Sequence, residues 1–124
     1  ERPADLVALR GELPRGLPAE LFAMPALERI HREGKEPRHR EHVTYYAYEY
    51  PDRFQRTTID VPEELRHPRL RITLDTEEDY RLCQAVAEHF RGNRRVSSRE
   101  VVRFLLDHPE VAALNAHVRQ KPVV

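Results

Sequence analysis

The alternation of apolar and polar residues along the chain predicts a mixed α/β fold. Short alternating runs predict strands, and Pro18 biases the residue before it toward extended geometry. The segments expected to be strands or extended are residues 5–9, 17–22, 54–61 and 70–74. Apolar residues at helical spacing predict helices over residues 24–33, 40–50 and 76–90, a helix after Ser97 and a further helical turn from Pro109. We therefore expect three or four short strands with about four helices.

Two helix starts carry explicit capping signals. Thr76 and Asp79 have the T-x-x-D form of a capping box, and Ser97 and Glu100 have the S-x-x-E form. Gly34 is placed to end helix 24–33, and residues 35–40 are expected to be a polar connection. The core stripe of helix 76–90 is expected to consist of Tyr80, Cys83, Ala87 and Phe90, widened by Leu82 and Val86.

The segment 40–50 is rich in tyrosine, with Val43, Tyr46, Ala47 and Tyr50 at the spacing of one helical face. Such a surface is either part of the core or a subunit contact, where tyrosine is enriched. A stacking platform for nucleic acid is the less favoured interpretation, because such platforms come with a basic groove.

The composition narrows the classes of protein to which the chain can belong. The chain has 124 residues, the size of one small domain, and 34% of them are charged. Lys and Arg number 21, as do Asp and Glu, so no net field attracts nucleic acid or a membrane. No apolar run is long enough to span a membrane, and we take a cytoplasmic location as the default. Because the sequence begins with Glu1 and not with Met, we expect a processed or trimmed piece.

Several side chains are candidates for chemistry. Asp75 follows the predicted strand 70–74, and ligands of open α/β sheets gather at the carboxyl ends of strands. From spacing alone, a helix-capping role for Asp75 is favoured over a ligand role. Glu20 lies in an apolar extended run, where the solvent face is the default and a binding site is the alternative.

The histidines and the cysteine give weaker signals. His31, His39 and His42 are close in sequence, but no zinc-ligand pattern is present, so a solvated basic face is favoured over a metal site. The single cysteine, Cys83, permits no disulfide within the chain and is expected to be a small buried thiol.

Four stretches of the chain occur in a distinctive order. They are PRGLPAELF at 14–22, REHVT at 40–44 followed by Tyr48, RITLDTEED at 71–79 and LNAHVRQK at 114–121. In this order and spacing they resemble the carboxy-terminal half of the cytidylyltransferase family. This family includes the spore coat polysaccharide biosynthesis protein F type and relatives of the 3-deoxy-manno-octulosonate and acylneuraminate cytidylyltransferases. The resemblance covers nearly the whole chain, so we expect a single module over residues 1–124.

The resemblance implies a fold and an activity. It implies a partial Rossmann-like nucleotidyltransferase fold and the transfer of CMP from CTP to a sugar or sugar acid, with Mg²⁺, for surface polysaccharide synthesis. Asp75 matches an acid that helps to hold the metal in related members, and its carboxylate is a suitable donor for Mg²⁺. Glu20, Arg40 and His42 match positions that we expect to shape the sugar pocket or a dimer contact.

The chain also departs from the family pattern. It lacks the glycine- and arginine-containing loop that grips the CTP phosphates and the second metal-binding acid, and Pro18-Ala19 replaces the usual Asp-Val before Glu20. We therefore expect a chain that is inactive alone, completed by a missing segment or a partner chain. An exposed sheet edge would favour a homodimer or a swapped assembly.

Two other functions are alternatives for this sequence. One is a non-catalytic dimerisation or interaction module that has kept this part of the fold and lost the chemistry. The other is an independent small enzyme, for which no nucleophile and base at recognisable spacing were found.

Overall fold

The computed structural model describes residues 3–123, and its contacts divide the chain into two compact units. The first unit contains the residues up to Arg10, residues 19–60 and the tail from Lys121. The second contains Gly11–Pro18 and Val61–Gln120. The class is the mixed α/β class expected from the sequence, with six α-helices and one two-stranded parallel sheet in the described residues. Whether the chain acts as a single module stays a prediction.

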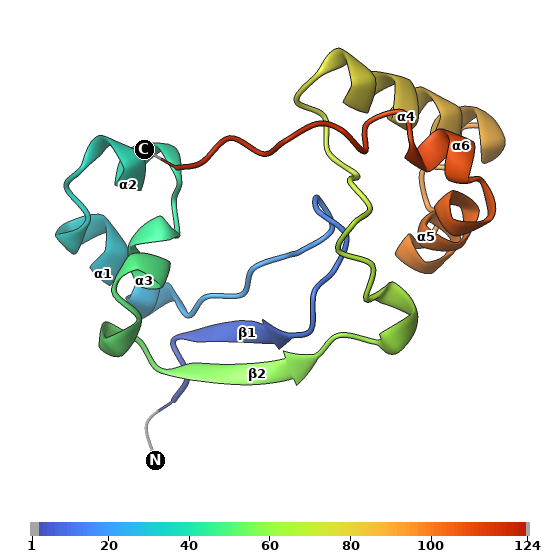
Figure 1. Cartoon of the computed structure of the whole chain (residues 1–124). Helices are drawn as coiled ribbons and strands as arrows, with labels where there is room; N and C mark the ends of the chain where they lie inside the picture. The colour runs from blue at the N-terminus through green and yellow to red at the C-terminus, as the bar shows by residue number, and fades with distance from the viewer. Residues whose placement is uncertain (1–2, 124) are drawn as a thin grey trace. The chain divides into compact units, whose positions relative to one another are not determined.

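The first unit is built around two parallel strands, drawn as neighbouring arrows in Figure 1. Strand β1 (Leu6–Arg10) pairs with β2 (Arg56–Asp60), with Leu6 opposite Arg56 and Arg10 opposite Asp60. The other edge of β1 is met by the segment around Phe22, whose predicted extended geometry gives one antiparallel bridge with Leu6. The edge of β2 away from β1 has no strand partner within residues 3–123.

Three α-helices complete this unit. Helix α1 (Met24–Glu33) has the predicted bounds, with Pro25 in its first turn and Gly34 as its C-cap. Helices α2 (Pro37–Glu41) and α3 (Tyr45–Glu49) are short, and a 3₁₀ turn, η1 (Pro51–Arg53), leads toward β2. Their apolar residues form one core: Leu6, Ala26, Ile30, Tyr46, Ala47 and Phe54.

The apolar core of this unit packs against one face of the sheet. Leu6 and Ala8 face the core, whereas Leu9 and Ile59, opposite each other in the ladder, belong to the other face because side chains alternate along a strand. Ile59 is 53% exposed. Parallel sheets in proteins are normally covered on both faces, so this face is unusual for a parallel sheet.

The second unit is helical. Its elements are the 3₁₀ turn η2 (Glu63–Leu65) and helices α4 (Glu77–His89), α5 (Ser98–Asp107) and α6 (Pro109–Ala112). Both predicted capping boxes are present, from Thr76 to Asp79 and from Ser97 to Glu100. Leu82 of α4 shares a buried core with residues of α5, and burial of such a side chain contributes about 1.5–3 kcal/mol. The buried core residues are Leu82, Val101, Phe104 and Leu105.

The predicted strand at 70–74 is not formed as a regular strand. Its only ladder contact in the described chain is an isolated parallel bridge between Arg15 and Arg71, with Ile72 N–H donating to the Arg15 carbonyl at 2.7 Å. A strand needs a neighbour along its length, and here the neighbour is one residue of a turn. The two regular strands are thus fewer than the three or four expected.

The prediction for segment 35–50 was wrong in its boundaries. Pro37 begins a helix inside the expected connection, and Glu36 and His39 form its capping box. The expected helix 40–50 is interrupted between Glu41 and Tyr45. Tyr46 and Ala47 are buried in the core, one of the two alternatives for this face, whereas Val43 is 68% exposed.

The predicted core face of helix 76–90 was also displaced. Tyr80 is 53% exposed and Ala87 lies at the surface, whereas Leu82 is fully buried. Asp79 is buried on the same helix. A buried acid in the first turn rotates the inward face away from the one that apolar spacing alone indicates.

Candidate functional site: a carboxylate on a buried polar network

Asp75 lies on the turn that enters α4, one residue before the N-cap Thr76. The helix is therefore capped by Thr76, whose hydroxyl accepts from the Asp79 N–H at 3.2 Å, and the capping role predicted for Asp75 from spacing is wrong. The side chain of Asp75 is 62% exposed, and its one ion pair is with Arg71 Nη2 at 3.4 Å. The Asp75 carboxylate is thus available to a ligand.

The buried carboxylate of Asp79 fixes the conformation of this turn through hydrogen bonds. Its carboxylate is fully buried and accepts from Arg71 Nε at 2.9 Å and from Arg71 Nη2 at 3.0 Å. It also accepts from the backbone N–H of Asp75 at 2.9 Å and from the Thr73 hydroxyl at 2.9 Å. The Arg71 guanidinium is the main cause that holds the pKa of Asp79 well below its ordinary value. Asp79 is therefore ionised and structural, and it fixes the backbone that presents Asp75.

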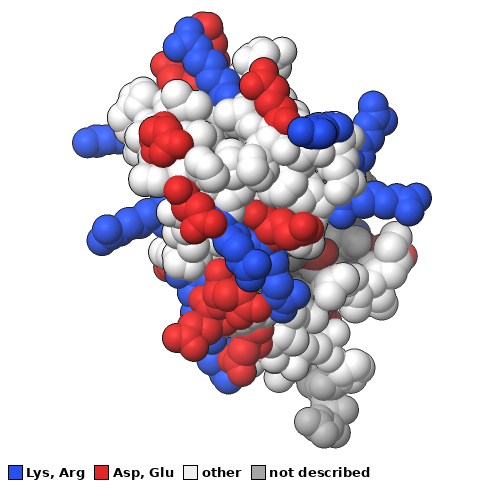
Figure 2. Space-filling view, turned by 90° about the vertical axis from the view of Figure 1, so that its right-hand side faces the viewer, with Lys and Arg blue, Asp and Glu red and all other residues white. Residues whose placement is uncertain are grey.

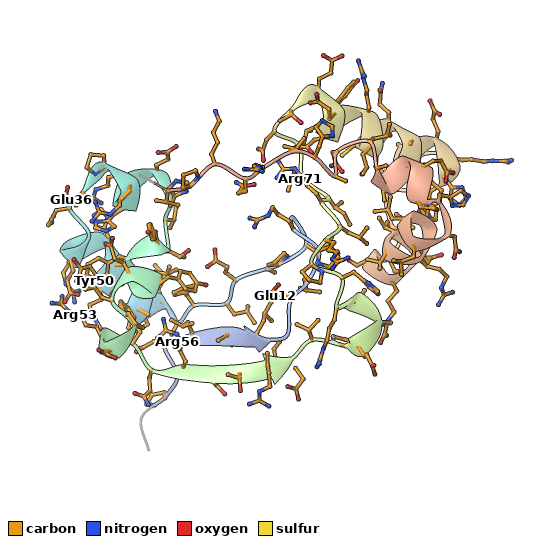
Figure 3. The ribbon with its side chains drawn as sticks, viewed as in Figure 1. Glu12, Glu36, Tyr50, Arg53, Arg56 and Arg71 are labelled. Carbon is orange, nitrogen blue, oxygen red and sulfur yellow. The ribbon has the colours of Figure 1, made fainter. Side chains whose placement is uncertain are left out.

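Two residues near the carboxy terminus complete the hydrogen-bond network around Arg71, which is labelled in Figure 3. Asn115 is buried, and its Nδ2 donates to Asp79 Oδ1 at 2.8 Å and to the Arg71 carbonyl at 3.0 Å. Gln120 Oε1 accepts from Arg71 Nη1 at 3.0 Å. Asn115 Oδ1 is buried without a partner in the described chain, a loss of about 1–3 kcal/mol that the two bonds of Nδ2 must offset.

Sequence reasoning found this site only in part. It singled out Asp75 and saw Asp79 as a capping acid, but it assigned no role to Arg71, Asn115 or Gln120. All three lie within stretches that carry the family resemblance. An arginine at the start of an apolar run was the one available signal, because a buried arginine requires an acid partner.

The donor set fits a shared magnesium site and not a complete one. Asp75 supplies one exposed carboxylate, and no group of three His, Cys, Asp or Glu side chains capable of holding a metal occurs in the part of the chain that is described. Mg²⁺ is commonly bound by one or two carboxylates together with substrate phosphates. Asp75 therefore fits as one protein ligand of such an ion, whereas the buried and saturated Asp79 does not.

In the first unit, Glu20 is tied to two hydroxyl groups. The Thr44 hydroxyl lies 3.0 Å and 2.9 Å from the two carboxylate oxygens, and the Tyr48 hydroxyl donates to Oε2 at 2.7 Å. Partial burial of its hydroxyl and the bond to the negative Glu20 raise the pKa of Tyr48 to about 12. The structure thus joins the first two resemblance stretches through side chains that sequence reasoning had not paired.

Arg40 and His42 do not join this cluster. Arg40 Nη1 lies 3.0 Å from His31 Nδ1, and His42 Nε2 lies 3.9 Å from Glu41 Oε2. Both side chains are exposed. Of the expected pocket residues, only Glu20 therefore has hydroxyl-bearing neighbours arranged around it.

His39 is buried and not part of a solvated face. Its Nε2 is 2.7 Å from Glu49 Oε1, and the same carboxylate pairs with Arg38 at 2.9 Å. Arg38, followed by His39, lowers the pKa of Glu49. These bonds hold α2 against α3, which explains why residues 37–49 fold as two short helices.

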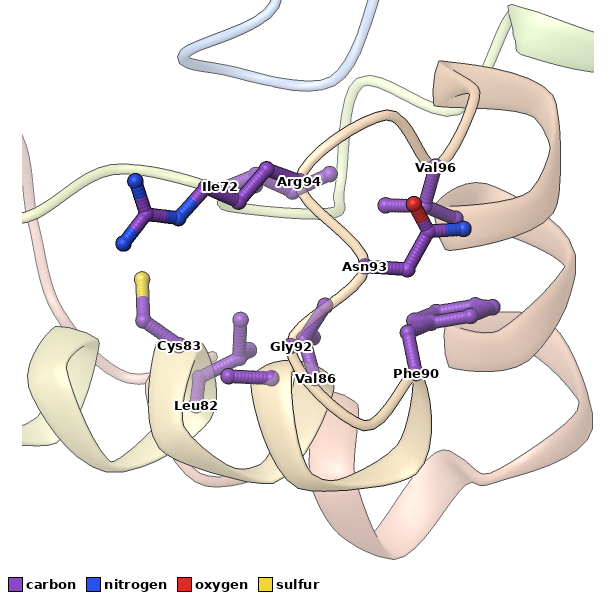
Figure 4. A pocket seen from close by; sticks show the side chains of 10 residues that line it. Ile72, Leu82, Cys83, Val86, Phe90, Gly92, Asn93, Arg94 and Val96 are labelled. Atoms are coloured by element: carbon purple, nitrogen blue, oxygen red, sulfur yellow. The ribbon is translucent and has the colours of Figure 1, made fainter.

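An apolar pocket of about 370 Å³ lies beside α4 in the second unit (Figure 4). Cys83 lines it, half-buried, and its thiol lies 3.6 Å from the Thr73 carbonyl. Burial raises the pKa of Cys83. The cysteine is therefore a packed thiol, close to the expectation from sequence. The other lining residues include Ile72, Leu82, Val86, Phe90 and Arg94.

Charges of both signs are interspersed on the face of the molecule shown in Figure 2, as equal numbers of acids and bases would suggest. Within residues 3–123, no helix has the length and apolar character needed to cross a membrane.

Comparison with known proteins finds similarity both in sequence and in fold. No family model matches the chain. It is 38% identical over 106 residues to the uncharacterized protein MJ1063 of Methanocaldococcus jannaschii, covering 86% of this chain and 43% of that protein. It is 31% identical over 100 residues to the spore coat polysaccharide biosynthesis protein SpsF of Bacillus subtilis, covering 80% of this chain and 42% of that protein.

The fold is similar to that of a cytidylyltransferase from Leptospira borgpetersenii, with a TM-score of 0.75 and 21% sequence identity. That match covers 96% of this chain and 48% of the solved one. The likeness to a cytidylyltransferase is thus one of fold, and the likeness to SpsF and MJ1063 is one of sequence. The chain spans less than half the length of each of these relatives.

Proposed function

We propose that this chain is the carboxy-terminal part of a magnesium-dependent cytidylyltransferase that transfers CMP from CTP to a sugar or sugar acid. The observation that carries the proposal is the exposed carboxylate of Asp75, held on a turn by the buried pair of Arg71 and Asp79. This turn lies in one of the two stretches whose resemblance to the family is fairly specific. The similarity to SpsF, whose name refers to polysaccharide biosynthesis, supports a sugar as the acceptor.

In this proposal the residues of the chain have separate tasks. Asp75 would hold Mg²⁺, which when bound supplies positive charge that neutralises the triphosphate during transfer. Arg71 and Asp79 keep the turn rigid, because their buried ion pair is also bonded to the backbone of Asp75. In the first unit, Glu20, with Thr44 and Tyr48, would accept hydrogen bonds from sugar hydroxyls, and Arg40 and His42 would be further sugar-side residues.

The remaining part of the site would come from a polypeptide segment equivalent to the other half of the relatives. The uncovered face and free edge of the parallel sheet support this, because Ile59 and Thr57 are exposed where a covering layer is normal. A segment that brings the CTP-binding loop would cover this face.

The test is a calorimetric titration of the chain with CTP and MgCl₂. Asp75→Asn is the test variant, and Asp107→Asn is a matched control, because Asp107 is an exposed acid of the same unit. We expect binding to be lost in Asp75→Asn and kept in Asp107→Asn. Equal binding by both variants would refute the assignment of Asp75.

If the chain alone does not bind CTP, the same pair of variants is assayed for pyrophosphate release in the complete enzyme. Loss of a carboxylate metal ligand is expected to reduce the rate by about 100-fold or more. An Asp75→Asn enzyme with unchanged activity and an unchanged magnesium requirement would show that the metal is held elsewhere.

A dimerisation module is the second candidate, favoured by an apolar surface on the first unit. Met24 is 65% exposed and Val43 is 68% exposed, and each borders a groove that also contains Leu27 of α1. The partner in this case is a second copy of the chain. Sedimentation equilibrium of the wild-type chain and Val43→Glu tests it: a monomeric wild type argues against it, and a dimer dissociated by Val43→Glu supports it.

A further inference from the structure

The Arg71 guanidinium donates to the carboxylates of Asp79 and Asp75 and to the amide oxygen of Gln120, and the lengths of these bonds differ. Nε and Nη2 form short bonds with the two oxygens of Asp79, at 2.9 Å and 3.0 Å. Nη1 donates to Gln120 Oε1 at 3.0 Å. The contact of Nη2 with Asp75 Oδ2, at 3.4 Å, is the longest of the four.

We propose that Gln120 is a positioning residue for Asp75. By accepting from Nη1, it keeps the guanidinium occupied on the side away from Asp75, so that the Asp75 carboxylate stays free for a divalent cation. The proposal rests on the proposed function, since it concerns the same carboxylate and the same metal ion.

The role of Gln120 follows from the number of N–H donors on the arginine side chain. Arg71 is buried, and a guanidinium has five N–H donors that need acceptors. Asp79 already accepts on both oxygens from Arg71, Asn115, Thr73 and the backbone. If the amide of Gln120 is removed, Asp75 is the nearby carboxylate with remaining capacity, and a tighter pair with Arg71 competes with metal binding.

Gln120 is well suited to a test because it lies at the surface, outside both apolar cores. Gln120→Ala removes the acceptor. Gln120→Glu keeps an acceptor at the same reach and adds a negative charge, which strengthens the hold on Arg71. Gln84→Ala is the matched control, because Gln84 is an exposed glutamine on α4.

The experiment is a titration of the isotope-labelled chain with Mn²⁺, with and without CTP, followed by paramagnetic broadening of backbone amide signals. The quantity compared is the Mn²⁺ concentration that half-broadens the amides of Asp75 and Thr76, relative to that for Asp107. Gln120→Ala is expected to raise it by roughly threefold to tenfold, the scale of a competing ion pair. Gln120→Glu and Gln84→Ala are expected to stay at or below the wild-type concentration.

The outcomes distinguish the metal role of Asp75 from the positioning role of Gln120. If the wild-type chain shows no selective broadening at Asp75, the inference about Gln120 is refuted, and the metal role of Asp75 is decided separately by pyrophosphate release in the complete enzyme. If wild type shows it and Gln120→Ala behaves as Gln84→Ala does, the metal role stands and the inference about Gln120 is refuted. If Gln120→Ala alters the amide spectrum throughout, Gln120→Glu decides: weaker binding of Mn²⁺ by this variant refutes the inference.

Discussion

Replacement of Asp79 by Asn should strongly destabilise the second unit. Asp79 is fully buried, and its partner Arg71 is 7% exposed. The Asn side chain deprives the Arg71 cation of its buried counter-ion and places an NH₂ donor where a carboxylate oxygen accepted from surrounding donors. Removal of one partner of a buried ion pair costs about 3–5 kcal/mol, which for a chain of this size lowers Tm by on the order of 10–20 °C.

Urea and thermal unfolding followed by circular dichroism measure this effect. Glu77→Gln is the matched control: it lies in the same first turn of α4, and its ion pair with Arg81 is exposed. An exposed pair contributes less than about 1 kcal/mol. If Asp79→Asn and Glu77→Gln lower the free energy of unfolding by similar amounts, the reasoning about the buried network is wrong.

The pH dependence of stability gives a second readout for Asp79. Its pKa is lower in the folded chain than in the unfolded one, chiefly because of Arg71. The stability that it contributes is therefore complete above its unfolded pKa of about 3.9 and is lost as the pH falls below that value. The wild-type chain should lose free energy of unfolding between about pH 4 and pH 2 more steeply than Asp79→Asn does. Parallel slopes would contradict this assignment.

Three further predictions concern other parts of the chain. Gly16→Ala should cost about 2 kcal/mol or more in urea unfolding, because the new Cβ would lie 1.8 Å from the Ile72 carbonyl oxygen; Gly92→Ala, also at positive φ but with open space, should cost only about 1 kcal/mol. Tyr48→Phe should lower the free energy of unfolding by about 1 kcal/mol, because the hydrogen bond to Glu20 is lost. In an ultraviolet titration, this variant should lack the tyrosine that ionises near pH 12 in the wild type. Alkylation of Cys83 by iodoacetamide should be slower at pH 7.5 than that of a free thiol and should rise at higher pH than usual, since burial raises its pKa; reactivity equal to that of glutathione would contradict this.

The residues that define the ends of helices were predictable because their signals act over a few residues. Pro25 and Gly34 set the bounds of α1, and Thr76 and Ser97 cap α4 and α5 through bonds to residues three positions later. The exposed Asp75 next to a helix start was found for the same reason. The family resemblance added the expected metal role, which no local pattern contains.

The tertiary structure alone decided what surrounds these residues. The apolar run 70–74 alternates as a strand does, but the described chain offers it only one bridge at Arg71, so it stays irregular. Helix 40–50 is divided because Glu49 binds Arg38 and His39, which lie outside the apolar repeat. Long-range pairing of this kind leaves no periodic trace in a sequence.

The same division applies to the candidate site. Sequence by itself determined the α/β class, the start of α4 and the carboxylate that precedes it. It did not determine that Asp79 is a buried anion or that Asn115 and Gln120 reach Arg71 across 44 and 49 positions. The reason is physical: a capping bond is closed by local backbone geometry, whereas a buried charge is stable only where folding brings its partners together.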